Sequence, residues 1–221
     1  MSVRLAVSGS NSTGDVPFSA ALSTAAGISV LNSPAGERGD LVRLCQTLCD
    51  QQGLTPAQIE QVFVDVGPGS YTGLRVAVTF VRFLQAFGSI PVQAVDSLAV
   101  LAWHACGQAA DGVRVRPLLD ARRGRYHTAC FEYRDGKLIE TEASNATNAE
   151  QVLAALAPGT LVVMPAGLGE QLLEPLRERK IDVQIARELS AATLFAPGLP
   201  NFVANAEDLE PRYLMATYAE E

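Results

Sequence analysis

Residues 62–87 read VFVDVGPGSYTGLRVAVTFVRFLQAF. Residues 62–66 are mostly β-branched or aromatic, a composition that favours a strand. Residues 67–70 favour a tight turn, because glycine takes φ values closed to other residues and proline fixes its own φ. From about Thr72 the apolar pattern becomes helical, and Ser70 or Thr72 can cap the helix. The stretch therefore predicts a strand, a turn and a helix.

The predicted helix carries a wide apolar surface. Its polar side chains are spaced four, three and three residues apart and form one narrow stripe, made by Arg75, Thr79, Arg82 and Gln85. A helix on one face of a sheet needs an apolar stripe of only about 100°. Two interpretations follow: the helix is enclosed between its own sheet and neighbouring helices, or a partner protein covers part of it.

Composition limits the classes of function. The chain has 221 residues, a formal net charge of −7 and 48% hydrophobic residues, which is typical of a globular protein of one or two domains. The negative charge argues against autonomous nucleic-acid binding, which needs clustered lysine and arginine. No apolar run approaches the ~18 residues of a membrane span, and the N-terminus has no signal-peptide pattern. We expect a cytoplasmic protein without membrane association.

Metal and catalytic chemistry are not indicated by the histidines and cysteines. The four cysteines form neither a CxxC pair nor a zinc-type spacing. His104 and His127 are the only histidines and belong to no HExxH motif. We predict no metal site and no catalytic residue.

The order of predicted elements suggests two α/β lobes. Each half opens with three strands that include a glycine-containing turn, and each continues with helices and strands in alternation. We expect one lobe over residues 1–107 and a second over residues 108–221. The expected strands are 4–7, 18–23, 27–32, 62–66, 92–95, 115–119, 126–133, 137–141 and 160–164, and the expected helices are 40–52, 55–58, 72–87, 96–106, 149–156 and 170–178.

Three polar segments could hold a ligand. Residues 8–15, SGSNSTGD, invite a phosphate-binding interpretation, but the absence of lysine favours an exposed hairpin connection. Residues 67–73 match neither GxGxxG nor GxxxxGK[ST]. Asp120, Arg122 and Arg123 form a charged cluster at a strand end. For this cluster we favour an ion pair between the lobes over catalysis.

Three motifs in this sequence resemble those of one family. They are GPGSYTGLR at residues 67–75, DARRGRY at residues 120–126 and EPRYL at residues 210–214. In this order and separation they resemble the TsaB (YeaZ) family, subunits of tRNA threonylcarbamoyladenosine biosynthesis. The resemblance covers nearly the whole chain. It implies the two-lobed α/β fold of actin, sugar kinases and Hsp70 ATPase domains (the ASKHA, ribonuclease H-like fold), with a mixed sheet in each lobe.

The resemblance also implies a non-catalytic scaffold. Proteins of this kind pair with the catalytic homologue TsaD, which supplies the active site and metal for transfer of threonylcarbamoyl to N6 of adenosine 37 in tRNA. TsaE supplies ATPase action, and tRNA is met only indirectly. The implied interface lies on helices 40–52 and 72–87. Its implied residues are Leu41, Leu44, Cys45, Leu48, Tyr71, Leu74, Arg75, Val78, Thr79 and Arg82.

The sequence departs from the family pattern at two places. Ser8 stands where relatives carry aspartate, and a hydroxyl is a poor substitute for a carboxylate that faces a hard cation. Glu37 and Arg38 stand where relatives carry a His-Ser pair. We therefore expect no cofactor and no functional ATP binding. A residual nucleotide site would involve Ser8, Gly9, Ser10, Gly69 and Ser70.

Two other functions stay open. One is a diverged paralogue that forms a homodimer through the same helices and no longer modifies tRNA. The other is a small-molecule kinase or acyltransferase on the same fold, which would need a carboxylate placed for Mg²⁺ between the lobes.

Overall fold

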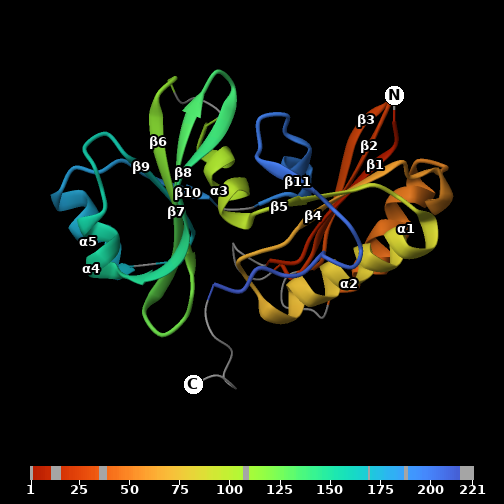
Figure 1. Ribbon diagram of the computed structural model, residues 1–221, viewed down its shortest axis with the longest axis horizontal. Coiled ribbons are helices and arrows are strands. Elements are labelled where there is room, and N and C mark those ends of the chain that lie inside the picture. Colours follow the sequence, from red (N-terminus) through yellow and green to blue (C-terminus); the bar gives the residue numbers. More distant parts are fainter. Residues whose placement is uncertain are drawn as a thin grey trace. The chain divides into compact units, whose positions relative to one another are not determined.

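The computed structural model of the chain describes residues 2–10, 16–34, 39–106, 110–168, 170–186 and 189–214 (Figure 1). Contacts divide the chain into two compact units. The first unit comprises Met1–Ser97, Ser190–Pro197 and Asn201–Arg212, and the second comprises Leu98–Leu189, Gly198–Pro200 and Tyr213–Glu221. This division differs from the predicted lobes, because the first break falls at Ser97 and residues near the C-terminus return to the first unit.

The first unit is built on a six-stranded mixed sheet with the order β11-β5-β4-β1-β2-β3. Strands β1, β2 and β3 are antiparallel, β4 and β5 run parallel to β1, and β11 is antiparallel to β5. The strands are β1 (Arg4–Ser8), β2 (Ser19–Thr24), β3 (Gly27–Asn32), β4 (Gln61–Asp65), β5 (Val92–Val95) and β11 (Asn201–Ala204).

Helices α1 (Leu41–Gln51) and α2 (Tyr71–Gly88) cover one face of this sheet. Alternate strand side chains such as Val62 and Val64 point to them and join one apolar core, because successive side chains of a strand face opposite sides. The short helix η2 (Ala191–Phe195) lies on the other face, where the rings of Phe63 and Phe195 are 5.4 Å apart. A further short helix, η1 (Pro56–Gln58), precedes β4.

The predicted helix starts are confirmed. Asp40 Oδ1 accepts a hydrogen bond from the Arg43 N–H at 3.0 Å and caps α1. The Ser70 hydroxyl accepts one from the Gly73 N–H at 3.3 Å and caps α2. These oxygens satisfy donors that have no partner within the helix.

The second unit contains a five-stranded mixed sheet with the order β10-β9-β6-β7-β8. Helices α4 (Ala149–Ala154) and α5 (Glu170–Glu178) pack on one face over a core that includes Leu118, Val162 and Leu172. Helix α3 (Ser97–Cys106) contributes Trp103, whose ring lies 6.1 Å from that of Tyr133 on β7. The strands are β6 (Val113–Asp120), β7 (Arg125–Arg134), β8 (Lys137–Asn148), β9 (Leu161–Pro165) and β10 (Val183–Ala186).

The two sheets share one arrangement. In each, three antiparallel strands come first, and two later strands are added in parallel on the side of the first strand. The predicted repeat, with a mixed sheet in each of two units, is therefore confirmed. Strands β10 and β11 and helix η2 were not predicted, and β8 is longer than residues 137–141 because its polar, exposed residues continue to pair with β7. Within the described residues, no helix is long and apolar enough to cross a membrane.

Candidate functional site

The turn after β4 requires glycine at its first position. Gly67 has φ of +101°, a conformation that side-chain-bearing residues rarely adopt, and a Cβ at this position would collide with the Leu74 side chain. The Gly67–Pro68 peptide bond is cis. The turn brings the chain from the carboxyl end of β4 directly to the N-terminus of α2.

A buried carboxylate holds this turn in place. Asp65, at the end of β4, is only 2% exposed. It accepts hydrogen bonds from the Ser8 hydroxyl at 2.8 Å, from the Gly67 N–H at 3.0 Å and from the Ser97 hydroxyl. These donors compensate for the loss of hydration that burial imposes on a charge. Because the Ser8 hydroxyl donates directly to Asp65, a carboxylate at position 8 would set two negative charges against each other.

The loop after β1 packs directly on the N-terminus of α2. The Ser70 N–H donates to the Ser10 carbonyl oxygen at 2.7 Å. Gly9 and Gly73 meet backbone to backbone, so that a Cβ on either would collide with the carbonyl of the other. A Cβ on Gly69 would likewise collide with Ser10. The structure thus brings the residues of the possible nucleotide site together, in contact with one another. The loop's later residues, 11–15, lie outside the described residues, as do Glu37 and Arg38.

The C-terminal EPRYL motif contacts the same turn. The Arg212 N–H donates to the Val66 carbonyl oxygen at 2.7 Å, and its guanidinium pairs with Asp96 at 2.6 Å. The predicted return of this segment to the body of the protein is confirmed at Arg212. Asp65 was missed as a structural residue, although a single acidic residue inside an apolar strand is a usable signal for a buried carboxylate. Asp96 was expected only as a possible cap of the helix over 96–106, and its pairing with Arg212 was not predicted.

Helix α2 buries one side and exposes the other. Leu74 and Val78 lie in the interior, whereas Tyr71, Arg75 and Thr79 are exposed, as is Arg82. The Arg75 guanidinium lies 4.2 Å from the centre of the Tyr71 ring. Gln85 departs from the predicted polar stripe, because its side chain is half-buried and donates to the Ala204 carbonyl oxygen of β11 at 2.9 Å.

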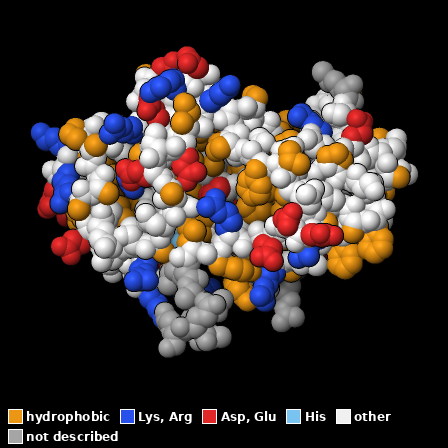
Figure 2. Space-filling view, viewed as in Figure 1, with side chains coloured by type: hydrophobic (Ala, Val, Ile, Leu, Met, Phe, Trp, Pro, Cys, Tyr) orange, Lys and Arg blue, Asp and Glu red, His pale blue; other side chains and the backbone are white. Residues whose placement is uncertain are grey.

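A row of apolar side chains lies beside this polar stripe on the exposed side of α2. Val76, Phe83 and Phe87 are seven and four residues apart, which places them on one line of the helix at about 100° per residue. Phe83 is 57% exposed and Phe87 is 84% exposed, and their rings stack with centres 5.9 Å apart. Figure 2 shows apolar side chains at the molecular surface over this helix. The described chain therefore does not enclose α2.

Most of the predicted interface residues on helix α1 are buried. Leu41, Cys45 and Leu48 face the sheet and lie in the core, while Leu44 is half-buried. Burial raises the pKa of the Cys45 thiol to about 12, with smaller contributions from Cys49 and Asp40. With Leu74 and Val78, these core residues of the expected interface have almost no surface to offer. Leu41, Leu44, Cys45 and Leu48 follow one another at i, i+3, i+4 and i+7, the spacing of a helix packed on its own sheet.

Comparisons with known proteins identify the family. The model of the family described as "TsaD: tRNA N6-adenosine threonylcarbamoyltransferase" matches residues 38–173, more than half of the chain. The chain belongs to this family. Its resemblance to TsaB is confirmed by a curated relative, the tRNA threonylcarbamoyladenosine biosynthesis protein TsaB of Bacillus subtilis (strain 168), which is 41% identical over 90 residues. That match covers 41% of this chain and 37% of the relative.

Solved structures of YeaZ proteins share the TsaB-like fold of this chain. YeaZ from Pseudomonas aeruginosa superimposes with a TM-score of 0.78 at 23% identity, over 97% of this chain and all of the other. A second structure from Pseudomonas aeruginosa, described as an uncharacterized protein with similarity to peptidase YEAZ, gives a TM-score of 0.78 at 24% identity, with coverage of 97% and 100%. These similarities establish the fold: the predicted two-lobed ASKHA-like class is confirmed.

The DARRGRY motif of this TsaB-like chain forms the hairpin between β6 and β7. Asp120 Oδ1 accepts a hydrogen bond from the Arg122 N–H at 2.7 Å, and Arg122 and Arg123 have φ of +64° and +51°. Asp120 thus fixes the turn through the backbone. An ion pair between the lobes stays a prediction.

The two histidines differ in burial. Burial lowers the pKa of His127 to about 4, against a smaller raising effect of Asp120, and His104 is exposed. Among the described residues, no three His, Cys, Asp or Glu side chains are grouped to hold a metal ion.

Proposed function

We propose that this chain is a non-catalytic subunit in the biosynthesis of threonylcarbamoyladenosine in tRNA. The proposal is supported by the family match over residues 38–173 and by the segment shared with the curated TsaB protein. In it, a TsaD-type partner transfers the threonylcarbamoyl group to N6 of adenosine 37 and supplies the active site and metal. TsaE acts through that partner, and this chain meets tRNA only indirectly.

The exposed side of α2 carries the proposal. We name it the α2 docking surface; it consists of Val76, Phe83 and Phe87 with the flanking residues Tyr71, Arg75, Thr79 and Arg82. A contiguous row of exposed apolar side chains with a polar border is typical of a protein interface. Aromatic residues and arginine are also the types enriched in interface cores. We infer that a TsaD-type protein covers this surface, with α1 at its border.

Charge favours an unlike partner over a second copy. Arg75 and Arg82 are exposed on the docking surface, so a partner that offers carboxylates would complement them. In a twofold homodimer centred on α2, the docking surface of one copy contacts the docking surface of the other. The arginines of the two copies would then lie near each other. The apolar row would still permit self-association, and a homodimer is therefore one of the outcomes of the test.

We propose that the chain needs no nucleotide. Three donors already occupy Asp65, and Ser8 provides a hydroxyl where a carboxylate would be needed to hold Mg²⁺. At the N-terminus of α2 the Ser70 N–H already donates to the Ser10 carbonyl oxygen and the Gly73 N–H to the Ser70 hydroxyl, so neither donor is left for a phosphate. A calorimetric titration with ATP and Mg²⁺ is expected to give no micromolar binding. Such binding would instead favour the kinase or acyltransferase alternative.

Co-purification with the TsaD-type protein of the same organism tests the pairing. The unmodified chain is expected to elute with that partner from a sizing column. Arg75→Glu reverses a charge on the docking surface and should abolish the complex while the monomer stays folded. Arg177→Glu reverses the charge of an exposed arginine on α5 and is the matched control. A stable complex with Arg75→Glu, or a TsaD-type complex that never contains this chain, would contradict the proposal.

A further inference from the structure

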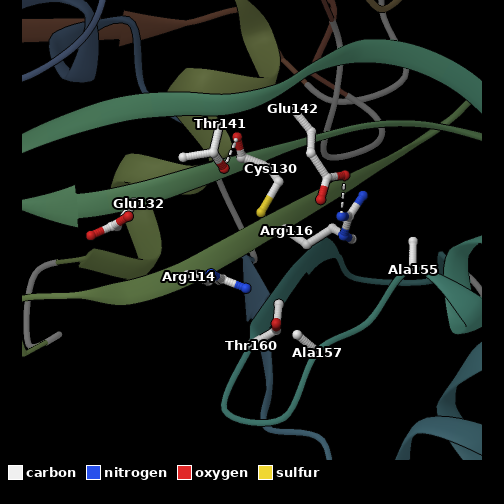
Figure 3. Close-up of a pocket in the computed structure, with 9 residues that line it drawn as sticks. All are labelled: Arg114, Arg116, Cys130, Glu132, Thr141, Glu142, Ala155, Ala157 and Thr160. Carbon is white, nitrogen blue, oxygen red and sulfur yellow. Dashed lines mark hydrogen bonds and ion pairs between the residues drawn. The ribbon is translucent and has the colours of Figure 1, made fainter.

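A polar cavity of about 200 Å³ opens in the second unit (Figure 3). It lies between strands β6, β7 and β8 and the segment that joins α4 to β9. Arg114 and Arg116 of β6, Cys130 of β7, Glu142 of β8 and Thr160 before β9 are among the residues that line it. All of these residues belong to one compact unit, and none is part of the α2 docking surface.

Local structure explains why a cavity forms here. Arg114 and Arg116 lie on the same face of β6 as Leu118, the face that α4 and α5 cover further along the strand. Helix α4 ends at Ala154, and the following segment offers the small side chains of Ala155 and Ala157 and then Thr160 to the cavity. The pairing of β7 with β8 shifts register at Cys130, a bulge of the kind that redirects side chains. Among the described residues that line the cavity, none has a large apolar side chain.

One guanidinium at the cavity is buried and incompletely bonded. Arg116 is 3% exposed, and its Nη2 pairs with Glu142 Oε2 at 2.5 Å. Its Nε–H is also buried and has no hydrogen-bond partner among the described residues. A buried donor without a partner costs free energy, because it has lost water and gained nothing in return. An oxygen atom of a ligand in the adjoining cavity would supply the missing acceptor.

The charged side chains around the cavity are only partly paired. Glu142 is paired with Arg116, and Glu132, at the same cavity, is paired with Arg134. Arg114 forms no ion pair with any of the described residues, and both Arg114 and Thr160 line the cavity (Figure 3). The cavity therefore offers hydrogen-bond donors of Arg114 and Arg116. Its lining holds two arginines and two glutamates, and with Arg134, the partner of Glu132 outside the cavity, the group carries a net charge of +1.

We propose that this cavity binds the carboxylate group of a small organic acid. One carboxylate oxygen accepts from Arg114, the other accepts from Arg116 Nε–H, and the Thr160 hydroxyl donates to either. Arginine side chains are well suited to carboxylates, because their N–H groups are planar and fixed in direction. Glu132 and Glu142 stand at the wall, so a singly charged carboxylate suits the site better than a doubly charged phosphate. The site does not depend on pairing through α2.

Arginine Nε–Hε signals of the full chain, labelled with ¹⁵N, provide a direct test. Sodium acetate, sodium phosphate and sodium chloride are titrated at constant ionic strength, and Arg116→Lys assigns the signal of Arg116. We expect acetate to shift that signal saturably and chloride to leave it unchanged. Arg114→Gln should weaken acetate binding about tenfold, the effect of losing one charge-assisted hydrogen bond. Thr160→Val, which keeps the side-chain shape, should weaken it by a smaller factor.

Arg125→Gln is the matched control, since it removes an exposed arginine at the other end of β7, outside the cavity. It should bind acetate as the unmodified chain does. The proposal would be overturned if acetate gave no saturable shift up to about 100 mM. A dissociation constant above that concentration is too weak for specific binding. Equal affinity in Arg114→Gln and Arg125→Gln, or a preference for phosphate over acetate, would also overturn it.

Discussion

Truncation of Phe83 to alanine measures what the α2 docking surface contributes to association. An aromatic side chain buries about 150–250 Å² when fully covered. Phe83 is 57% exposed, so a partner can cover roughly 110 Å² of it. At about 25 cal/mol per Å² this corresponds to nearly 3 kcal/mol, of which about 2 kcal/mol is lost because alanine retains its Cβ. We therefore expect the dissociation constant to rise about thirtyfold.

Sedimentation velocity with the TsaD-type partner, at a series of concentrations, gives that dissociation constant. Ile139→Ala is the matched control, because Ile139 is a large apolar residue of similar exposure on β8 in the second unit. Both variants should keep the melting temperature of the unmodified chain within about 2 °C, since exposed side chains contribute little to folding.

The comparison has outcomes that exclude one another. An unchanged dissociation constant for Phe83→Ala, or an equal weakening by Ile139→Ala, would refute the assignment of the interface to α2. If the chain self-associates and only the homodimer weakens, the surface is an interface between copies, and the proposed pairing with a TsaD-type protein is contradicted.

Three further predictions concern the turn and the second unit. Gly73→Ala is expected to lower the free energy of unfolding by about 1–3 kcal/mol in urea titrations, because the added Cβ collides with the Gly9 carbonyl. Gly88→Ala is the control: its Cβ meets only the Ile90 side chain, so the free energy of unfolding should change by less than about 1 kcal/mol. Asp65→Asn should cost about 1–3 kcal/mol in the same titrations, since an amide NH₂ cannot accept from all three donors; no loss would contradict the role of Asp65. Burial holds the pKa of His127 near 4, below its usual value of about 6.5. As the pH drops, the unfolded chain therefore binds a proton at His127 before the folded chain does. The free energy of unfolding should fall between about pH 6.5 and pH 4. His127→Gln should flatten that part of the curve of unfolding free energy against pH, and an unchanged slope would contradict the burial argument.

The main features of the fold could be predicted from residue patterns. The change from a β-branched run to a helical period at residues 62–87, with a glycine turn between, fixes a strand followed by a helix, and Asp40 and Ser70 have the chemistry of helix caps. Strands β10 and β11 could not be found in the same way. Each has four residues, and exposed apolar side chains such as Val203 give no alternation along β11.

The candidate site was predicted only in outline. The width of the apolar surface on α2 was visible in the sequence, but which side of the helix faces the sheet was not. Leu74 and Val78 proved to be core residues, whereas Phe83 and Phe87, about 100° or more around the helix, are exposed. The Asp65 network and the cavity at Arg116 depend on residues far apart in sequence, and no local pattern shows such pairings.

The central claim is that this chain acts in tRNA modification by docking through α2. Mass spectrometry of nucleosides from total tRNA, in cells that lack the chain, tests it most directly. We expect threonylcarbamoyladenosine to disappear on deletion, to return with the unmodified chain or Ile139→Ala, and to stay absent with a Phe83→Asp, Phe87→Asp double variant. Normal levels of the modified nucleoside in the deleted cells, or full restoration by the double variant, would contradict the claim.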